Sequence, residues 1–533
     1  MDQNLLNVKI LGVILGVLLI LINDSHGDRM RAGYTYPLKI ESDDNEHSQI
    51  TPERDYHNDI GKDGKMWKLQ YEGVSYVAVH FKCFNLRTGE YLSISDATGK
   101  QNYIIEGEGR KGTNGKFWAP HIKGDTMMIE LISDFKNHTS NVFEIDEVGL
   151  GDPSISWENT PRQLRGSVVE DYAGYYHARK LDNCGVNDRR NAICYKDEFP
   201  EHYETAKAVA RLLIQGSFLC TGWLASDNSH LITNYHCIAD AQDALNTDFE
   251  FEAETPSCEE PNGQLKTQGV LYSGSTFLLG DQAKDYAVVL VSGNPSETYP
   301  YLEFEMDLAL IDPDEDTAFS EAVLGMEIYM PQHSAGFDKE FGIESSHEQD
   351  QALGSNTCHV NGFILAACTA SGGYFEVGYF CDSLGGSSGS AVLSSTSHKV
   401  IALHHCGTPN CAAFNLGVPI NEVFSDICAE ESLAIFWDCD ATPPPTTTLP
   451  PPPAVSLNSC EGRCGGQAAN CWCDGQCVNF GDCCEDSCKF CGFNCNDNPN
   501  LTSSPTSSPT ISPTSRPSPS PTLSPSRSPT SRP

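Results

Sequence analysis

The chain has 533 residues, 72 of them acidic and 34 basic, which gives a formal net charge of −38 at neutral pH. A charge this negative argues against a nucleic-acid-binding protein, because phosphate contacts require an excess of Lys and Arg. The length indicates several domains rather than one core, and the 23 cysteines indicate an oxidising compartment in which disulfides form.

The amino-terminal segment 1–27 has the pattern of a secretory leader. Lys9 precedes an uninterrupted apolar run from Ile10 to Ile22, and Gly27 provides a small residue for cleavage. The run is shorter than the roughly 20 residues that a membrane span needs. We therefore predict a secreted, extracellular protein with no membrane span after cleavage, and an uncleaved anchor is the alternative.

Residues 28–150 are predicted to form a small β-sandwich, and 151–182 a connecting segment. Apolar residues alternate with period two at 74–81 and more loosely at 127–132, and Thr88-Gly89 marks a turn. We find no catalytic constellation in this region. A pro-segment, an inhibitory cover and an accessory domain all remain open. Asn137 and Asn500 are glycosylation acceptors by pattern.

The segment 183–440 carries the residues that indicate chemistry. Cys184 and Cys194 bracket a polar loop, for which we expect a local disulfide. Further along, His236 is followed directly by Cys237 and preceded by Cys220. A histidine beside a cysteine is usually structural, so this cluster needs support from elsewhere in the chain.

Two aspartates after this histidine each precede an apolar run. Asp285 leads the run 286–291, which ends at a clear turn, and Asp307 leads the shorter run 308–311. Either carboxylate can orient an imidazole. Asp307 lies in acidic surroundings, so a solvated acid at the start of a strand is an alternative reading for it.

A serine in a glycine-rich turn completes the set. Ser388 stands between Gly386 and Gly389 at the start of an apolar run. Glycines allow a sharp turn and a close approach to the backbone. A serine hydroxyl is a weak nucleophile that needs a base and an anion-binding pocket, for which we predict the N–H groups of Gly386 and Ser388.

Together, the two cysteines, His236 and the Gly-x-Ser-Gly-Ser turn resemble the chymotrypsin-like serine proteases. The resemblance implies an all-β fold of two six-stranded antiparallel β-barrels, a disulfide between Cys220 and Cys237, and a catalytic triad of His236, Asp285 and Ser388. Asp285 is preferred over Asp307 because its longer strand and its Asp-Tyr-Ala-Val-Val sequence match the family pattern. Segments 208–224, 328–333 and 402–407 look like the lysyl and glutamyl endopeptidase branch, which resembles this chain over roughly 180–430. This branch favours a strand for the ambiguous run 206–214.

Two residues bear on substrate preference. Asp382 holds the place of the acid that pairs with Arg or Lys at the floor of the trypsin pocket, whereas His404 matches a histidine that receives acidic side chains in glutamyl enzymes. A buried carboxylate in the pocket favours a substrate side chain that carries a positive charge, so we expect cleavage after Lys or Arg. A Cys381–Cys406 disulfide would brace the pocket walls.

The segment departs from the chymotrypsin pattern in one place. Ser387 replaces the aspartate that captures a new amino terminus in that family, so activation by that ion pair is not expected. His359, His404 and His405 lack metal-site spacing, and we predict no metal and no cofactor.

The carboxy-terminal part contains no further catalytic motif. Residues 441–456 form a Pro/Thr-rich linker, and the Ser/Pro/Thr-rich tail 497–533 lacks the apolar content to fold. The segment 457–496 is rich in cysteine and resembles a somatomedin B domain, a disulfide-stapled module that binds proteins. Its eight diagnostic cysteines are Cys460, Cys464, Cys471, Cys473, Cys477, Cys483, Cys484 and Cys488.

We therefore predict a secreted serine endopeptidase that acts on polypeptides, with a module that binds an extracellular partner at a cell surface or wall. The alternative is a catalytically inactive, protease-like adhesion or matrix protein that binds partners through the somatomedin B-like domain.

Overall fold

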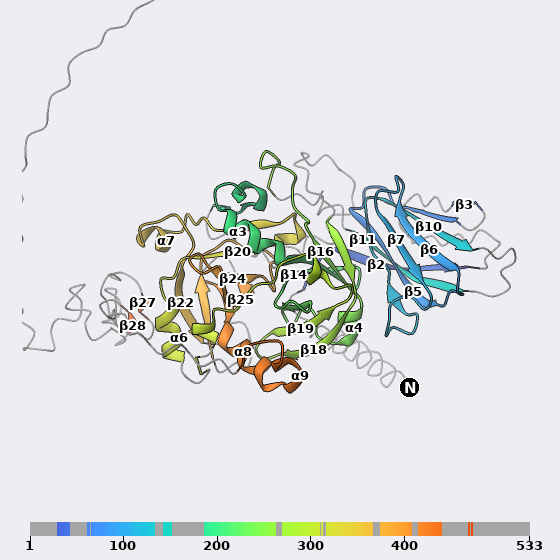
Figure 1. The fold of residues 1–533 in the computed structure, drawn as a ribbon. Helices are drawn as coiled ribbons and strands as arrows, with labels where there is room; N and C mark the ends of the chain where they lie inside the picture. Colours follow the sequence, from blue (N-terminus) through green and yellow to red (C-terminus); the bar gives the residue numbers. More distant parts are fainter. Residues whose placement is uncertain are drawn as a thin grey trace, which may run out of the picture. The chain divides into compact units, whose positions relative to one another are not determined.

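The computed structural model consists mostly of antiparallel β-sheets with a few short helices (Figure 1). The chain divides into two compact units, Met1–Thr447 and Thr448–Pro533. Of the second unit, the structure describes only the backbone of β27 (Gln467–Ala468) and β28 (Cys471–Trp472), so the somatomedin B-like prediction lies outside the described residues. The described ranges are 29–42, 61–63, 66–133, 142–151, 186–262, 269–309, 311–312, 316–365, 374–407, 414–439, 467–468 and 471–472.

Two five-stranded sheets occupy the region predicted as a β-sandwich. Their strand orders are β3-β4-β10-β6-β7 and β2-β11-β5-β8, with β9 also paired to β5. Met127, Ile129 and Leu131 alternate along one strand and contribute to a core that both sheets share, as expected for half-buried strands. The strands are β2 (Gly33–Glu41), β3 (Gly61–Asp63), β4 (Met66–Gln70), β5 (Tyr76–Phe84), β6 (Glu90–Asp96), β7 (Asn102–Glu106), β8 (Phe117–Trp118), β9 (Ile122–Lys123), β10 (Thr126–Ser133) and β11 (Phe143–Gly151).

The next sheet has eight strands and carries the predicted histidine. Its order is β17-β16-β13-β14-β15-β19-β18, with β1 added to β14. The run 206–214 begins as a 3-10 turn and continues as a strand from Val209, in agreement with the expected strand. The strands are β1 (Met30–Arg31), β13 (Val209–Ile214), β14 (Phe218–Leu224), β15 (His230–Thr233), β16 (Thr247–Phe251), β17 (Val270–Ser273), β18 (Ser275–Asp281) and β19 (Tyr286–Val291).

A second eight-stranded sheet carries the predicted nucleophile turn, in the order β12-β21-β20-β24-β25-β26-β23-β22. Among the described residues, no pairing of the outer strands closes either eight-stranded sheet, so the two six-stranded barrels remain a prediction. The strands are β12 (Arg190–Asn191), β20 (Ile328–Gln332), β21 (Glu340–Gly342), β22 (Val360–Leu365), β23 (Phe375–Tyr379), β24 (Ala391–Ser394), β25 (Val400–Gly407) and β26 (Asn415–Pro419).

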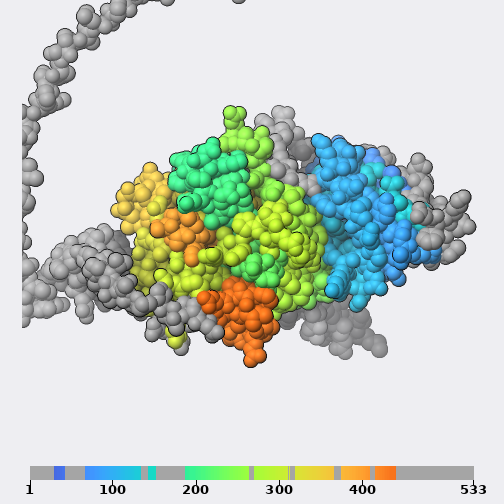
Figure 2. All heavy atoms as spheres, viewed as in Figure 1, coloured from blue at the N-terminus to red at the C-terminus, as the bar shows by residue number. Residues whose placement is uncertain are grey.

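Short helices fill the connections between these strands. The longest, α8, contacts β25 and β26, and with α9 it forms part of the orange surface in Figure 2. No helix in the described part of the chain is long and apolar enough to cross a membrane. The helices are α3 (Pro200–Thr205), α4 (Ala241–Leu245), α5 (Met306–Ala309), α6 (Asp316–Val323), α7 (Glu348–Ala352), α8 (Ile420–Ala429) and α9 (Glu431–Ala434).

Two disulfides differ from those that the sequence suggested. Cys194 bonds to Cys258 rather than to Cys184, because the segment after β12 lies against the loop 258–262, where the Asn191 side chain donates to the Glu260 carbonyl. 

Cys381 bonds to Cys358 rather than to Cys406. Strands β22 and β23 are antiparallel, and the pairing of Val360 with Tyr379 brings the start of one strand to the end of the other. Local spacing in the sequence cannot reveal either pairing, because the partners meet only after the sheets form.

Buried ion pairs join the amino-terminal sheets to β16. Asp248 lies 2.9 Å from an Arg110 nitrogen and 3.0 Å from His121 Nδ1. Glu250 lies 2.7 Å from Lys123 Nζ and 2.7 Å from an Arg211 nitrogen. Burial raises the pKa of Glu250, but Arg211 and Lys123 outweigh this effect and the pKa is lowered.

Burial lowers the pKa of Lys123 to about 8. A buried charge is tolerated only when it is paired. Matched charges therefore hold the amino-terminal sheets to β16. If the amino-terminal sheets and β16 separated, each would be left with charged groups that lack their partners.

The substitution Asp248→Ala should lower the free energy of unfolding by about 3–5 kcal/mol, because it leaves Arg110 and His121 buried without their anion. Urea denaturation measures this loss. The matched control is Glu303→Ala, which breaks a solvated pair with Lys399 and should cost less than about 1 kcal/mol. Equal losses in the two variants would show that the buried pairs do not hold the sheets together.

Candidate active site

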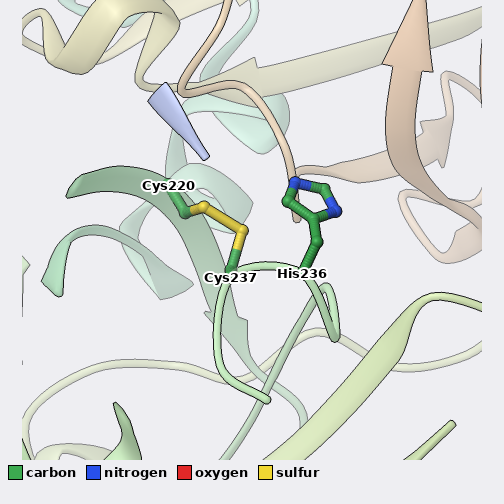
Figure 3. A group of neighbouring side chains, drawn as sticks. All are labelled: Cys220, His236 and Cys237. Carbon is green, nitrogen blue, oxygen red and sulfur yellow. A yellow bond between two sulfur atoms is a disulfide. The ribbon is translucent and has the colours of Figure 1, made fainter. Parts of the chain in front are cut away.

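The predicted histidine lies on a turn fixed by a disulfide. Strand β14 carries Cys220, and the turn after β15 carries His236 and Cys237; the two cysteines are bonded to each other (Figure 3). The imidazole of His236 projects away from the disulfide. The short covalent loop therefore fixes the backbone on which the ring is mounted.

Asp285 contacts His236 through both carboxylate oxygens. Its Oδ2 lies 2.7 Å from His236 Nδ1, and its Oδ1 accepts a hydrogen bond of 2.9 Å from the His236 backbone N–H. The Asn234 side chain donates to the Asp285 carbonyl at 2.8 Å. This aspartate has a φ of 51°, a left-handed conformation that non-glycine residues rarely adopt and that clusters at functional sites.

The Asp285 carboxylate is ionised. Burial raises its pKa, but His236 and His405 outweigh this effect and lower the pKa well below its usual range. The rival carboxylate, Asp307, is exposed on α5 and makes no hydrogen bond or ion pair with His236 among the described residues. The structure thus brings Asp285 to the histidine and leaves Asp307 in solvent.

The serine turn lies beside the histidine turn. Thr221 N–H donates to the Ser388 carbonyl at 2.8 Å, and the same carbonyl lies 3.9 Å from Cys237 Sγ. Within the described residues, the Ser388 hydroxyl makes no hydrogen bond, and the buried Nε2 of His236 has no partner. The serine and histidine turns are therefore adjacent, and no hydrogen bond joins the Ser388 hydroxyl to His236 in the described part of the chain.

Glycine is required on this turn for steric reasons. Gly386 and Gly389 have φ values of 93° and 88°, and a Cβ at Gly389 would lie 2.1 Å from the Thr221 carbonyl oxygen. Among the described residues, the N–H groups of Gly386 and Ser388 donate to no other group. The turn thus offers two unused donors, as an oxyanion-binding site needs.

Neutral groups support this turn from within. The Ser387 hydroxyl donates to Gln332 Oε1 at 2.6 Å and lies 3.0 Å from the Ser334 hydroxyl. The Leu384 N–H donates to the same Ser387 oxygen at 3.2 Å. Ser387 is fully buried, so a network of hydroxyl and amide groups surrounds the residue before Ser388.

A second histidine also contacts Asp285. Nδ1 of His405 on β25 lies 3.4 Å from Asp285 Oδ2, and Nε2 lies 3.4 Å from the buried carboxylate of Glu376. Burial lowers the pKa of His405, but the two carboxylates outweigh burial and raise it to about 9. His405 is therefore charged at neutral pH, and Asp285 lies between two imidazoles.

The sequence analysis assigned His404 to substrate binding, which stays a prediction, and it did not identify the contact of His405 with Asp285. The pairing of β25 with β26 shifts register between His404 and Cys406, as at a β-bulge, which re-aims a side chain; in the described residues, His405 is the one of the two histidines within ion-pair distance of Asp285. His404 Nδ1 lies 2.7 Å from the Tyr379 hydroxyl, and burial lowers its pKa to about 3. The sequence shows two adjacent histidines, but it does not show which of the two imidazoles contacts Asp285.

Asp382 is buried, and its groups are already hydrogen-bonded. Its Oδ2 accepts from the Asp188 N–H at 2.6 Å, and its carbonyl accepts from the Gln332 side chain at 2.9 Å. In the described residues, both His/Cys/Asp/Glu clusters near the site include disulfide-bonded cysteines, which offer no thiolate to a metal. A third cluster, His80 with Asp146 and Glu147, lies in the amino-terminal sheets.

Part of the chain matches a known protein family. Residues 184–311, which include His236 and Asp285, match the family described as lysyl endopeptidase, C-terminal domain. Among solved structures, the Rv3671c protease in its inactive form has a TM-score of 0.30 and 15% identity, with 44% of this chain and 94% of that chain covered. The serine endoprotease from Yersinia pestis has a TM-score of 0.28 and 11% identity, with 42% and 63% covered.

A curated relative extends over more of the chain. The secreted RxLR effector protein 73 of Plasmopara viticola is 32% identical over 345 residues, which cover 63% of this chain and 76% of the relative. At this identity and coverage, the chain belongs to the family of the secreted RxLR effector protein 73, and within it carries a segment that matches the lysyl endopeptidase C-terminal domain.

Proposed function

We propose that this protein is a secreted serine endopeptidase that hydrolyses peptide bonds through Ser388, His236 and Asp285. The observation that carries the proposal is the paired contact of Asp285 with the ring and the backbone of His236, beside a serine turn with two unused N–H donors. The match to the lysyl endopeptidase C-terminal domain and the predicted leader support it. The relative that is named a secreted effector supports an extracellular location.

Each group has a defined task in this mechanism. Ser388 Oγ attacks the scissile carbonyl while Nε2 of His236 accepts its proton and later delivers that proton to the leaving amine. Asp285 keeps the Nδ1 proton in place and stabilises the imidazolium. The N–H groups of Gly386 and Ser388 receive the negative charge that develops on the carbonyl oxygen.

His405 supports Asp285 from the other side. An imidazolium between Asp285 and Glu376 keeps the aspartate ionised in a buried setting, where an unpaired carboxylate would take up a proton. Glu376 in turn keeps His405 charged. In this proposal, the ionisation states of four linked side chains depend on one another: His236, Asp285, His405 and Glu376.

Cleavage after Lys or Arg is the preferred specificity. A buried carboxylate at Asp382 favours a cationic side chain. The neutral His404 supplies no positive charge for an acidic one. The net charge of −38 also attracts basic polypeptides. Binding of an extracellular protein partner by the segment 457–496 completes the proposal.

The substitution Ser388→Ala should abolish hydrolysis of casein and of Lys or Arg esters, and with it labelling by a fluorophosphonate probe. Ser395→Ala, just beyond β24, is the control and should be labelled like the wild type. Full peptidase activity in Ser388→Ala would overturn the assignment of the nucleophile. Failure of the wild type to be labelled would favour the inactive adhesion protein instead.

Asp285→Asn should lower kcat by about 10⁴-fold, because an amide favours the wrong imidazole tautomer. Asp307→Asn removes an equal charge from an exposed position and should leave kcat within about twofold. Steady-state kinetics on one ester substrate measure both variants. A larger loss in Asp307→Asn would transfer the role to that carboxylate.

His405 should make the protein less stable at alkaline pH. Its pKa rises from about 6.5 in the unfolded chain to about 9 in the folded one. The stabilisation is therefore complete below pH 6.5 and is lost as the pH rises through 9. Between pH 6 and 10, the wild type should lose on the order of 3 kcal/mol more unfolding free energy than His405→Gln.

Urea denaturation at each pH measures this difference. Glu376→Gln removes one of the two carboxylates and should give an intermediate pH dependence. Parallel curves for the wild type and His405→Gln would show that His405 is not held in its charged form.

A further inference from the structure

The first described residues add a strand to the sheet that carries the histidine turn. In β1, Met30 pairs with Leu219 and Arg31 with Phe218, and the Ala32 N–H donates to the Ser217 carbonyl at 2.7 Å. These contacts join residues far apart in the sequence. They place Arg29, the residue before β1, at the turn that follows His236.

The guanidinium of Arg29 binds two partners, one on that turn and one on α4. Its Nε donates to the backbone carbonyl of His236 at 2.5 Å. Its two terminal nitrogens donate to the two carboxylate oxygens of Asp243 on α4. The side chains of Arg29 and Asp243 are both only 3% exposed. A bidentate, desolvated Arg–carboxylate pair is strong and directional.

Asp243 lies at the carboxy-terminal end of the segment 236–243 and forms several of its hydrogen bonds. Besides Arg29, its carboxylate accepts hydrogen bonds from the Ala239 N–H at 3.1 Å and the Gln215 side chain at 2.5 Å. The guanidinium thus links the carbonyl at one end of the segment 236–243 to the carboxylate at the other. Withdrawing it would free the carbonyl of His236 and leave Asp243 buried with an uncompensated charge.

From this geometry we infer that Arg29 is a positioning residue for His236. Arg29 holds the backbone carbonyl of His236, while Asp285 holds the imidazole ring through Nδ1. The strand β1 and the residue before it thus contact the histidine side of the site. The inference rests on the proposed protease function.

Arg29→Gln should lower kcat and the rate of fluorophosphonate labelling by about 10²-fold, as expected for a small misplacement of a catalytic group, with KM changed less than about twofold. Arg29→Lys keeps a positive charge beside Asp243 but lacks the planar guanidinium that bonds both Asp243 oxygens. It should therefore have a kcat between those of Arg29→Gln and the wild type. The matched control is Arg31→Gln. Arg31 is exposed on the same strand and packs over the Phe218 ring at 4.9 Å, and its loss should leave kcat at the wild-type value.

Hydrogen exchange supplies a readout that does not depend on activity. In a Ser388→Ala background, Arg29→Gln should lose amide protection across 236–245 while the other strands of the sheet stay protected, and Arg31→Gln should exchange like the parent. Exchange and kcat equal to those of Arg31→Gln would overturn the role of Arg29.

The two proposals fail in different ways. A wild type that is not labelled refutes the protease function, while the exchange comparison still decides whether Arg29 holds the turn. If Arg29→Gln does not fold, Arg29→Lys serves in both measurements. Wild-type kcat together with wild-type exchange in Arg29→Lys would then overturn the inference, because a single ammonium group cannot replace the three-way contact.

Discussion

The site depends on one buried carboxylate. Asp285 is held ionised by His236 on one side and His405 on the other, and it receives a further hydrogen bond from the backbone of His236. A buried carboxylate without these partners would be protonated, and a protonated acid could neither orient nor stabilise an imidazolium. The left-handed backbone at this residue is tolerated because the surrounding sheet determines it.

Different interactions stabilise the two halves of the proposed site. The histidine half is fixed by charge and by covalent bonding, through the Asp285 carboxylate, the Arg29–Asp243 pair and the Cys220–Cys237 disulfide. The serine half is fixed by neutral hydrogen bonds from Thr221, Ser387 and Gln332.

Paired charged and polar groups also lie away from solvent between the amino-terminal sheets and β16. Arg110, His121 and Lys123 from the amino-terminal sheets meet Asp248 and Glu250 on β16 away from solvent. Desolvation offsets much of the attraction within an intact buried pair, but removing one partner is costly because it leaves the other buried charge uncompensated. They integrate the amino-terminal sheets with the rest of the unit, and Arg29 extends the same linkage to the histidine turn.

The sequence by itself indicated which local segments contribute to the candidate site. The glycines around Ser388, the His236-Cys237 pair and the apolar run after Asp285 are patterns whose meaning depends on neighbouring residues, and the structure brings Asp285 rather than Asp307 to the histidine. The period-two alternation in the amino-terminal region likewise predicted strands because burial on one face of a sheet follows that period. 

Only the tertiary structure decided which distant groups meet. Cys358 reaches Cys381 through an antiparallel strand pair, His405 rather than His404 faces Asp285, and Arg29 reaches His236 by adding a strand to a sheet. Each contact is set by strand register and by which face of a strand looks inward. These are properties of the assembled sheets that no single stretch of sequence contains.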